Sequence, residues 1–312
     1  MTLGIDVIQV LLLIVIAPLL RGMIGRVKAR IQNRRGASVF RPYADLWKLF
    51  RKEDLVPLTA SFLFRLCPIV LFAATLAAAA FVPVLHASSL LGNTGDFILL
   101  VYMLALARFF LVLGAMDGGS SFGGMGASRE ALVSTLAEAP LLLAMIAIAI
   151  VSHSASIASM VHWTAVRDPF QLSPVHAFAL VALAMVTIAE TGRVPVDNPV
   201  THLELTMIHE AMVLEYSGPS LALIEWANSI KLTLMFTLLI GLFAPWGIAA
   251  SLSFFGLGIA VATFALKIAI LIVALAALES GVAKLRMYLV PQYLGIACAI
   301  SVLAVVFTVF AR

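Results

Sequence analysis

Apolar residues run through the chain in long unbroken stretches that are separated by shorter polar segments. A helix of about 20 apolar residues crosses the roughly 30 Å hydrocarbon core of a bilayer. Eight stretches have this length, approximately 3–24, 65–86, 96–116, 131–152, 174–192, 220–244, 250–277 and 291–311. No basic segment precedes the first stretch, so we expect it to remain as a helix and not to be cleaved as a signal peptide. The pattern predicts an all-α integral membrane protein in which residues 1–312 form a single membrane domain.

The polar segment after the first stretch predicts an amphipathic helix. One face of it would carry the apolar residues Phe40, Tyr43, Leu46, Trp47 and Phe50. The opposite face would carry the charged residues Arg41, Asp45, Lys48, Arg51 and Lys52. Pro42 suits the first turn of such a helix. We expect the helix to lie at the membrane surface, either as an anchor in the lipid headgroups or also as a face that docks a partner protein.

Composition excludes a soluble globular enzyme, because 62% of residues are hydrophobic, only 12% are charged and the mean hydropathy is +1.09. A net charge of +4 is too small to suggest a nucleic-acid partner. The two cysteines, Cys67 and Cys298, lie in apolar runs with no metal-ligand spacing nearby. We therefore expect no iron–sulfur cluster, zinc or other cofactor to be bound by this chain.

Basic residues give the expected orientation. With alternating crossings, fifteen of the 20 Lys and Arg residues fall on the side of segments 25–64, 117–130, 193–219 and 278–290, counting Arg21 and Arg65 at the adjoining helix ends. Arg167 and Arg312 fall on the other side, and three lie inside the stretches. The positive-inside rule makes the first side cytoplasmic. The sequence thus predicts a multi-pass protein of the cell membrane with both termini in the periplasm.

Acidic residues crowd into one region at the membrane boundary. Six lie within 36 residues, namely Glu190, Asp197, Glu204, Glu210, Glu215 and Glu225. Glu138 lies inside the fourth stretch. Ionisable groups at membrane depth are costly and mark ion or proton paths by default, and crowded carboxylates populate both protonation states near neutral pH. Each acid alone has the alternative of a helix cap or a salt bridge, but the cluster predicts proton handling.

Several cations could balance these acids. Arg193, His202, His209 and Lys231 are close in sequence, and Lys267 is expected with Lys231 to extend a buried polar axis. Arg108 is explained by snorkelling towards the cytoplasmic interface. A metal site is not expected, because position 213 is Val and the pattern His-Glu-x-x-His fails at His209 and Glu210.

Residues 117–129 are rich in glycine and serine and predict a loop. The lysine of a nucleotide-binding P-loop is absent, so the glycines are expected to allow close approach of a neighbouring backbone.

Four motifs in order resemble the H-type (subunit 1) membrane family of respiratory complex I. The first polar segment reads Arg-Val-Lys-Ala-Arg-Ile-Gln-Asn-Arg-Arg-Gly at 26–36 and Tyr-Ala-Asp-Leu-Trp-Lys-Leu-Phe-Arg-Lys-Glu at 43–53. The others are Ala-Glu-Thr-Gly-Arg-Val-Pro-Val-Asp at 189–197, Glu-Tyr-Ser-Gly at 215–218 and Glu-Trp-Ala-Asn at 225–228.

Departures from that family point to one branch of it. Gly36-Ala37-Ser38 stands where complex I has Gly-Pro-Asn near its quinone chamber. Residues 201–215 and the run Ser-Ser-Phe-Gly-Gly-Met-Gly at 120–126 are similar to the membrane subunits of formate hydrogenlyase and hydrogenase-4, which are group 4 [NiFe] hydrogenases.

The resemblance implies a non-redox subunit of an oxidoreductase, seated between a hydrophilic arm and antiporter-like membrane subunits. The [NiFe] centre and Fe–S clusters would lie in the large and small hydrogenase subunits. The residues that match the family's acidic channel are Glu138, Glu190, Arg193, Asp197, Glu204, Glu215 and Glu225. His209, Glu210 and Lys231 join the expected proton path on local chemistry alone. The surface implied to meet the arm comprises Arg26, Arg30, Arg34, Arg35, Arg41, Asp45 and Lys48.

Two other functions remain open at this stage. The chain could be a quinone-site H-type subunit of a complex I-like dehydrogenase. A free-standing secondary transporter is the third hypothesis, which neither repeat halves nor a pair of broken helices supports.

Overall fold

The computed structural model describes residues 2–92, 96–166, 173–198, 207–249 and 254–310. Helices form nearly all of the regular structure in these ranges, where β pairing is limited to the isolated bridges His86–Ala249 and Asp96–Ser156. The helices are α1 (Thr2–Ile31), α2 (Arg41–Phe50), α3 (Phe62–Ala79), α4 (Phe97–Asp117), α5 (Ser121–Ser152), α6 (Ile157–Val166), α7 (Pro174–Glu190), α8 (His209–Val213), α9 (Gly218–Phe243), α10 (Phe254–Gly281), the 3₁₀ turn η1 (Met287–Leu289) and α11 (Val290–Phe310).

Seven helices in the described ranges are long and apolar enough to cross a membrane: α1, α3, α4, α5, α9, α10 and α11. This confirms the predicted all-α membrane fold, since a helix satisfies its own backbone polar groups where no water can reach them. The stretch expected as the fifth span forms α7, whose 17 residues make it shorter than any of these seven helices. The hydrophobic pattern did not predict α6, a further short apolar helix.

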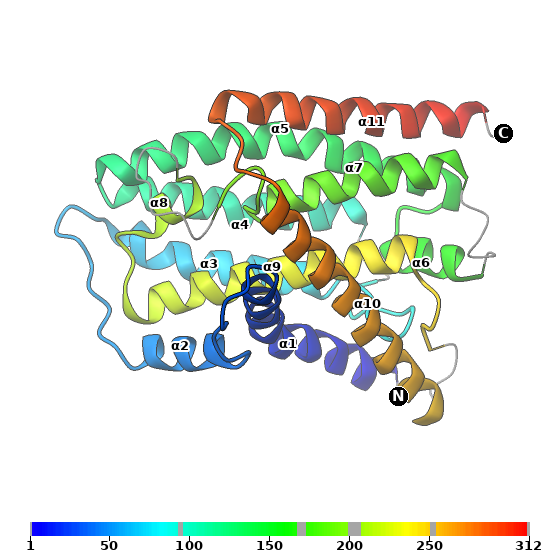
Figure 1. Ribbon diagram of the computed structural model, residues 1–312, viewed down its shortest axis with the longest axis horizontal. Helices are drawn as coiled ribbons and strands as arrows, with labels where there is room; N and C mark the ends of the chain where they lie inside the picture. The colour runs from blue at the N-terminus through cyan, green and yellow to red at the C-terminus, as the bar shows by residue number, and fades with distance from the viewer. Residues whose placement is uncertain (1, 93–95, 167–172, 199–206, 250–253, 311–312) are drawn as a thin grey trace.

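Most of the long helices lie side by side in one elongated bundle, and α10 crosses it obliquely (Figure 1). The start of α1 and the end of α11 lie at one end of the bundle, whereas α2 and α8 lie at the opposite end (Figure 1). α5, α7 and α11 pack against one another, while α3 packs on α4 and α9. α10 packs mainly on α1, with a smaller contact to α9.

α9 is the central helix of the bundle. In its most apolar window 78% of residues are buried, against 28% for α11 and 33% for α1. It contacts α1, α2, α3, α6, α7 and α10. A polar side chain on α9 is therefore surrounded by protein, and α9 carries both Glu225 and Lys231.

The glycine-rich segment was predicted as a loop, and that prediction is wrong. α5 begins at Ser121, so most of the segment is its first turns, and the Ser120 hydroxyl caps the helix by accepting from the Gly123 N–H at 3.1 Å. The glycines do permit the expected close approach. A Cβ at Gly126 would lie 2.9 Å from the Cβ of Ala211 and 3.0 Å from the carbonyl oxygen of Ile208. Helical geometry prevails because the missing side chains let α8 pack directly on α5.

The first polar segment folds back along α1 and then forms α2. A Cβ at Gly22 would overlap the carbonyl oxygen of Val39, so the chain passes in direct contact with α1 there. α2 is the predicted amphipathic helix, with Pro42 in its first turn, and it packs on α1 and α9. Its apolar face is only partly covered, because Phe40 and Trp47 remain 68% and 62% exposed.

Candidate functional site

Three acids of the predicted cluster, Glu190, Glu210 and Glu225, line a small polar cavity at the α2–α8 end of the bundle. The cavity has a volume of about 100 Å³. That volume is large enough for several water molecules, since one water needs roughly 10–15 Å³. The charged and polar side chains that line it are Arg21, Thr75, Arg108, Glu130, Glu190, Thr191, Arg193, His209, Glu210, Glu225, Asn228, Ser229 and Lys231.

Glu190 is the most enclosed carboxylate of the cavity. It ends α7, and its side chain is 0% exposed. One oxygen accepts from the Arg108 guanidinium on α4, and Lys231 Nζ on α9 lies 3.0 Å from the other. Arg108 does not snorkel, as the sequence had suggested, because the buried Glu190 charge holds its side chain inside the protein at 7% exposure. The side chain of Lys231 is 11% exposed and pairs with the same carboxylate.

Glu225 faces the same cavity from the second turn of α9. Its carboxylate pairs with Arg21 of α1, and Arg193 and His209 also interact with it electrostatically. The His209 ring lies close by, with Nε2 2.6 Å from the side-chain nitrogen of Asn228. Because that amide nitrogen donates, this ring nitrogen accepts. His209 thus lies among the charged side chains of the cavity.

Asp197 lies outside the cavity and organises the backbone beside it. One carboxylate oxygen accepts from the N–H groups of Ile208 and His209, at 3.3 and 3.1 Å. The other accepts from Lys284 Nζ at 2.6 Å and from the Asn198 N–H at 2.8 Å. These contacts satisfy the free N–H groups at the start of α8, as an N-cap does. Asp197 therefore fixes the position from which His209 reaches the cavity.

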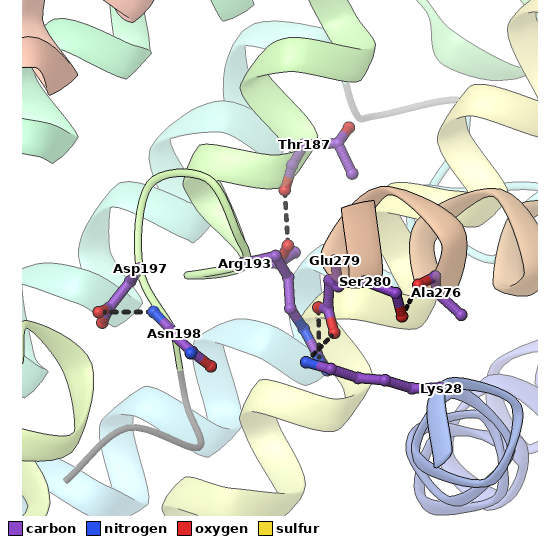
Figure 2. Close-up of polar contacts among 9 residues, drawn as sticks. Lys28, Thr187, Arg193, Asp197, Asn198, Ala276, Glu279 and Ser280 are labelled. Carbon is purple, nitrogen blue, oxygen red and sulfur yellow. Dashed lines mark hydrogen bonds and ion pairs between the residues drawn. The ribbon is translucent and has the colours of Figure 1, made fainter. Parts of the chain in front are cut away.

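A further buried carboxylate, Glu279, lies near the end of α10 next to the cavity. Its two oxygens lie 3.0 Å from Lys28 Nζ and 3.3 Å from an Arg193 guanidinium nitrogen. Figure 2 shows Lys28 reaching Glu279 from α1 while Arg193 reaches it from the turn after α7. Burial lowers the pKa of the Arg193 guanidinium, and the Glu279 charge opposes that shift. Arg193 thus links this ion-pair group to the cavity that it also lines.

The remaining predicted residues lie apart from the cavity or outside the described ranges. Glu138 is half-buried on α5 and does not line the cavity. Glu215 is also half-buried, with its Cγ 3.5 Å from where a Cβ on Gly118 would lie. Glu204 and His202 fall outside the residues that the structure describes. Lys267 joins no shared axis, because it donates to the Trp246 carbonyl and lies 5.2 Å from the centre of that ring.

Sequence reasoning missed several members of the site. Glu130 and Asn228 line the cavity, Arg21 pairs with Glu225, and Glu279 and Lys28 form the neighbouring group. The depth of Glu279 near the end of a long apolar run was a usable signal, because buried acids need partners. Its partner on α1 could not be inferred, since the two residues are 251 positions apart.

A second cavity lies between α2 and the α8–α9 region and has a volume of about 460 Å³. Arg21, Glu210 and Glu225 line both cavities. The second cavity differs from the first in its apolar walls, to which Leu46, Leu49, Val213, Leu214 and Leu221 contribute. It combines charged and apolar surface beneath the amphipathic helix.

All seven residues of the expected docking surface lie at the α2 end of the bundle, and each is at least partly exposed. Arg41 pairs with Asp45 at 3.1 Å along α2, and both side chains remain more than half exposed. The Arg34 N–H donates to the carbonyl oxygen of Ala29 at 2.8 Å, which folds the arginine-rich segment back on the end of α1. These charges are available to a partner of opposite charge.

Comparison with known proteins gives the family. The sequence model described as "NADH dehydrogenase" matches residues 5–309. The chain belongs to this family. Within the described residues, no group of three or more His, Cys, Asp or Glu side chains comes close enough to hold a metal ion.

Relatives within the NADH dehydrogenase family are similar over much of the chain. Formate hydrogenlyase subunit 4 of Escherichia coli (strain K12) is 34% identical over 289 residues, covering 91% of this chain and 92% of the relative. Hydrogenase-4 component C of the same organism is 33% identical over 299 residues, covering 96% and 93%. The H-type subunit of the NADH-quinone oxidoreductase of Salinibacter ruber is 26% identical over 210 residues, covering 62% and 58%.

The fold of this family member also matches a solved structure. A chain of the membrane-bound sulfane sulfur reductase (MBS), an archaeal respiratory membrane complex, superposes with a TM-score of 0.86 at 20% identity, covering 99% of this chain and 100% of that one. At this identity the match concerns the fold alone. The predicted resemblance to the complex I subunit 1 family and its hydrogenase branch is confirmed by the sequence relatives.

Proposed function

We propose that this chain is the membrane-anchoring and proton-coupling subunit of a membrane-bound [NiFe] hydrogenase complex of the formate hydrogenlyase type. It has no redox centre of its own. The small and large hydrogenase subunits, which would hold the Fe–S clusters and the [NiFe] centre, dock on its α2 end. Carboxylates of the polar cavity begin a proton path towards antiporter-like membrane subunits. The similarity to two hydrogenase membrane subunits over more than 90% of the chain supports this assignment.

The observation that carries the coupling role is the polar cavity. It gathers the acids Glu130, Glu190, Glu210 and Glu225 from four different helices and balances them with four cations. Carboxylates that are desolvated but hydrogen-bonded to cations and water change protonation with small changes in their surroundings. His209 lines the same cavity. Such a site can take up a proton and release it when the neighbouring charges move.

The test is a comparison of Glu225→Gln with Glu53→Gln in the intact complex. Both changes remove one carboxylate charge and keep the shape of the side chain, but Glu53 is exposed and lies in the polar segment after α2. We expect Glu225→Gln to abolish proton movement across sealed vesicles during hydrogen evolution, while hydrogen evolution from an artificial reductant in detergent is largely kept. Glu53→Gln should retain both. Full proton movement in Glu225→Gln would refute the proposal.

The second cavity favours one alternative, a quinone-site subunit of a complex I-like dehydrogenase. Its mixture of apolar and charged walls beneath α2 suits an amphipathic molecule that enters from the lipid phase. The purified complex separates the two functions: co-purified nickel with hydrogen evolution supports the hydrogenase, whereas quinone reduction without nickel supports the dehydrogenase. Periplasmic termini are part of both proposals and are tested separately below.

A further inference from the structure

Glu279 is the one buried carboxylate near the cavity that neither the sequence motifs nor the cavity lining includes, as far as the described residues extend. Its side chain is 1% exposed, and it is held between Lys28 and Arg193. Isolated buried charges are strongly unfavourable, so a carboxylate at this depth remains ionised only with partners of this kind.

Backbone hydrogen bonds hold Arg193 in place, and its side chain contacts two groups of residues. Its N–H donates to the Ile188 carbonyl oxygen at 3.0 Å, and its own carbonyl oxygen accepts from the N–H groups of Val196 and Asp197. Within the described chain its guanidinium pairs with Glu279 and with no other carboxylate. The same guanidinium lines the cavity and interacts electrostatically with Glu225. Arg193 therefore pairs with Glu279 on one side and lies near the cavity acid Glu225 on the other.

We infer that Glu279 is a positioning residue, which holds the Arg193 guanidinium at the edge of the polar cavity and keeps it from pairing with the cavity carboxylates. Figure 2 shows the arrangement: the Arg193 and Lys28 side chains both end at the Glu279 carboxylate, and Asp197 lies apart from them. The inference deepens the proposed coupling role and rests on it for its biological meaning. The electrostatic effect itself is a property of the folded chain and is measurable without turnover.

Removing the Glu279 charge should change the pH at which Glu225 is protonated in one direction. The freed guanidinium would turn to Glu225, and an added positive charge favours the ionised form of a carboxylate. Glu225 would then take up its proton at a lower pH than in the unaltered protein. The helices around this region contribute further charged groups: Arg21 and Lys28 of α1, Arg108 of α4, Glu130 of α5, Glu190 of α7, His209 and Glu210 of α8, Lys231 of α9 and Glu279 of α10. Arg193 adds its charge from the turn after α7.

The experiment is an infrared titration of the carboxyl C=O band of Glu225 in the purified complex, assigned by its loss in Glu225→Gln. We expect Glu279→Gln to move the midpoint of this band to lower pH by roughly one unit. Glu279→Asp keeps the charge and should restore most of the original midpoint. Ser280→Ala, one residue away and bonded only within α10 in the described structure, should leave it unchanged.

Lys28→Gln separates positioning from a simple anchor between α1 and α10. It breaks the contact between these helices but leaves Arg193 paired with Glu279, so the midpoint should stay in place. If Glu279 were only an anchor, Lys28→Gln and Glu279→Gln would have the same effect. If Glu279→Gln fails to assemble, the double variant Lys28→Gln with Glu279→Gln replaces it, because it removes one charge of each sign. We expect the Glu225 midpoint of this double variant to move to lower pH as well. An unmoved midpoint in Glu279→Gln or in the double variant would overturn the inference, and so would a shift in Lys28→Gln alone equal to that in Glu279→Gln.

The two proposals fail differently. If the chain does not couple proton movement, vesicle assays of every variant will be flat, but the infrared shift will still appear. If Glu279 does not position Arg193, the infrared midpoints will coincide while Glu225→Gln still abolishes proton movement.

Discussion

Lys231 Nζ, on the central helix α9, lies 3.0 Å from Glu190 Oε2 at the end of α7. Arg108 binds the other oxygen of this carboxylate, so one negative charge holds two buried positive charges. A single neutral substitution at Glu190 would leave both cations without their partner.

We therefore expect Glu190→Gln to destabilise the subunit by about 3–5 kcal/mol, because buried charges that lose their partner are costly. Adding Lys231→Met removes one of the stranded cations and should recover part of this loss. The midpoint of thermal unfolding, measured for both variants in the same detergent, checks the order. A Glu190→Gln variant with unaltered stability would contradict the ion-pair account. A Glu190→Gln variant that assembles and keeps full coupled turnover would show that Glu190 has a structural role only.

The membrane orientation is predicted from the distribution of basic residues. Cysteine placed at Ser38, in the exposed segment after α1, should be protected from an impermeant thiol reagent in intact cells. Cysteine placed at Ser173, just before α7, should react. The parent protein with its native Cys67 and Cys298 supplies the background. Labelling of Ser38→Cys from outside would invert the topology.

Reversing two charges on the expected docking surface should weaken assembly. Arg34 and Arg35 are exposed, and arginine makes the bidentate contacts with carboxylates that lysine cannot. We expect the double change to Glu to reduce the amount of catalytic subunit that co-purifies at moderate salt. Arg51→Glu is the matched control, because it reverses a charge on an exposed residue that the expected docking surface does not include. Equal recovery from the double variant, the control and the parent would argue against docking at this segment.

Asp197 is predicted to stabilise the short helix α8. Asp197→Ala removes the acceptor for the Ile208 and His209 N–H groups, so amide hydrogen exchange across residues 208–213 should accelerate roughly five- to tenfold, as for a cap worth about 1 kcal/mol. Lys284→Met keeps the acceptor and should change exchange less. If Lys284→Met loosened α8 as much as Asp197→Ala, the ion pair and not the cap would hold this segment.

Gly114 and Tyr216 give a steric prediction. A Cβ at Gly114 would overlap the Tyr216 hydroxyl, which is buried and has no hydrogen-bond partner within the described residues. Burial also raises the pKa of this phenol, so it stays protonated at neutral pH. Gly114→Ala should reduce thermal stability, and Tyr216→Phe in the same chain should restore most of it. Tyr216→Phe alone should cost little, because no described bond is lost. Failure of the rescue would place the clash elsewhere.

Much of the fold could be predicted from the hydrophobic pattern, because membrane helices are recognisable as long apolar runs. The prediction was wrong where contacts between helices determine the local structure. The glycines and serines after Asp117 are typical of a loop in isolation, yet Gly123 and Gly126 lie inside α5 because their lack of side chains allows close contact with α4 and α8. No local signal separates these two outcomes.

The site was predictable in part for a similar reason. Glu190, Glu225 and Lys231 could be selected because a charged residue in an apolar run needs a partner. Which partner each has depends on helices that are far apart in sequence, as with Arg21 and Glu225, 204 positions apart. The sequence therefore identified some of the acids but none of the ion pairs, and Glu130, Arg108 and Glu279 were assigned to the site only from the fold.

The paired carboxylates at this end of the bundle are also cross-links between helices. Glu190 joins α7 to α4 and α9, Glu225 joins α9 to α1, and Glu279 joins α10 to α1. A proton that neutralises one of these acids loosens a specific helix contact, and a movement that separates the helices changes the affinity of the acid for a proton by the same free energy. Proton occupancy and helix arrangement in this region are therefore a single equilibrium, and a partner that shifts one helix acts on every acid tied to it.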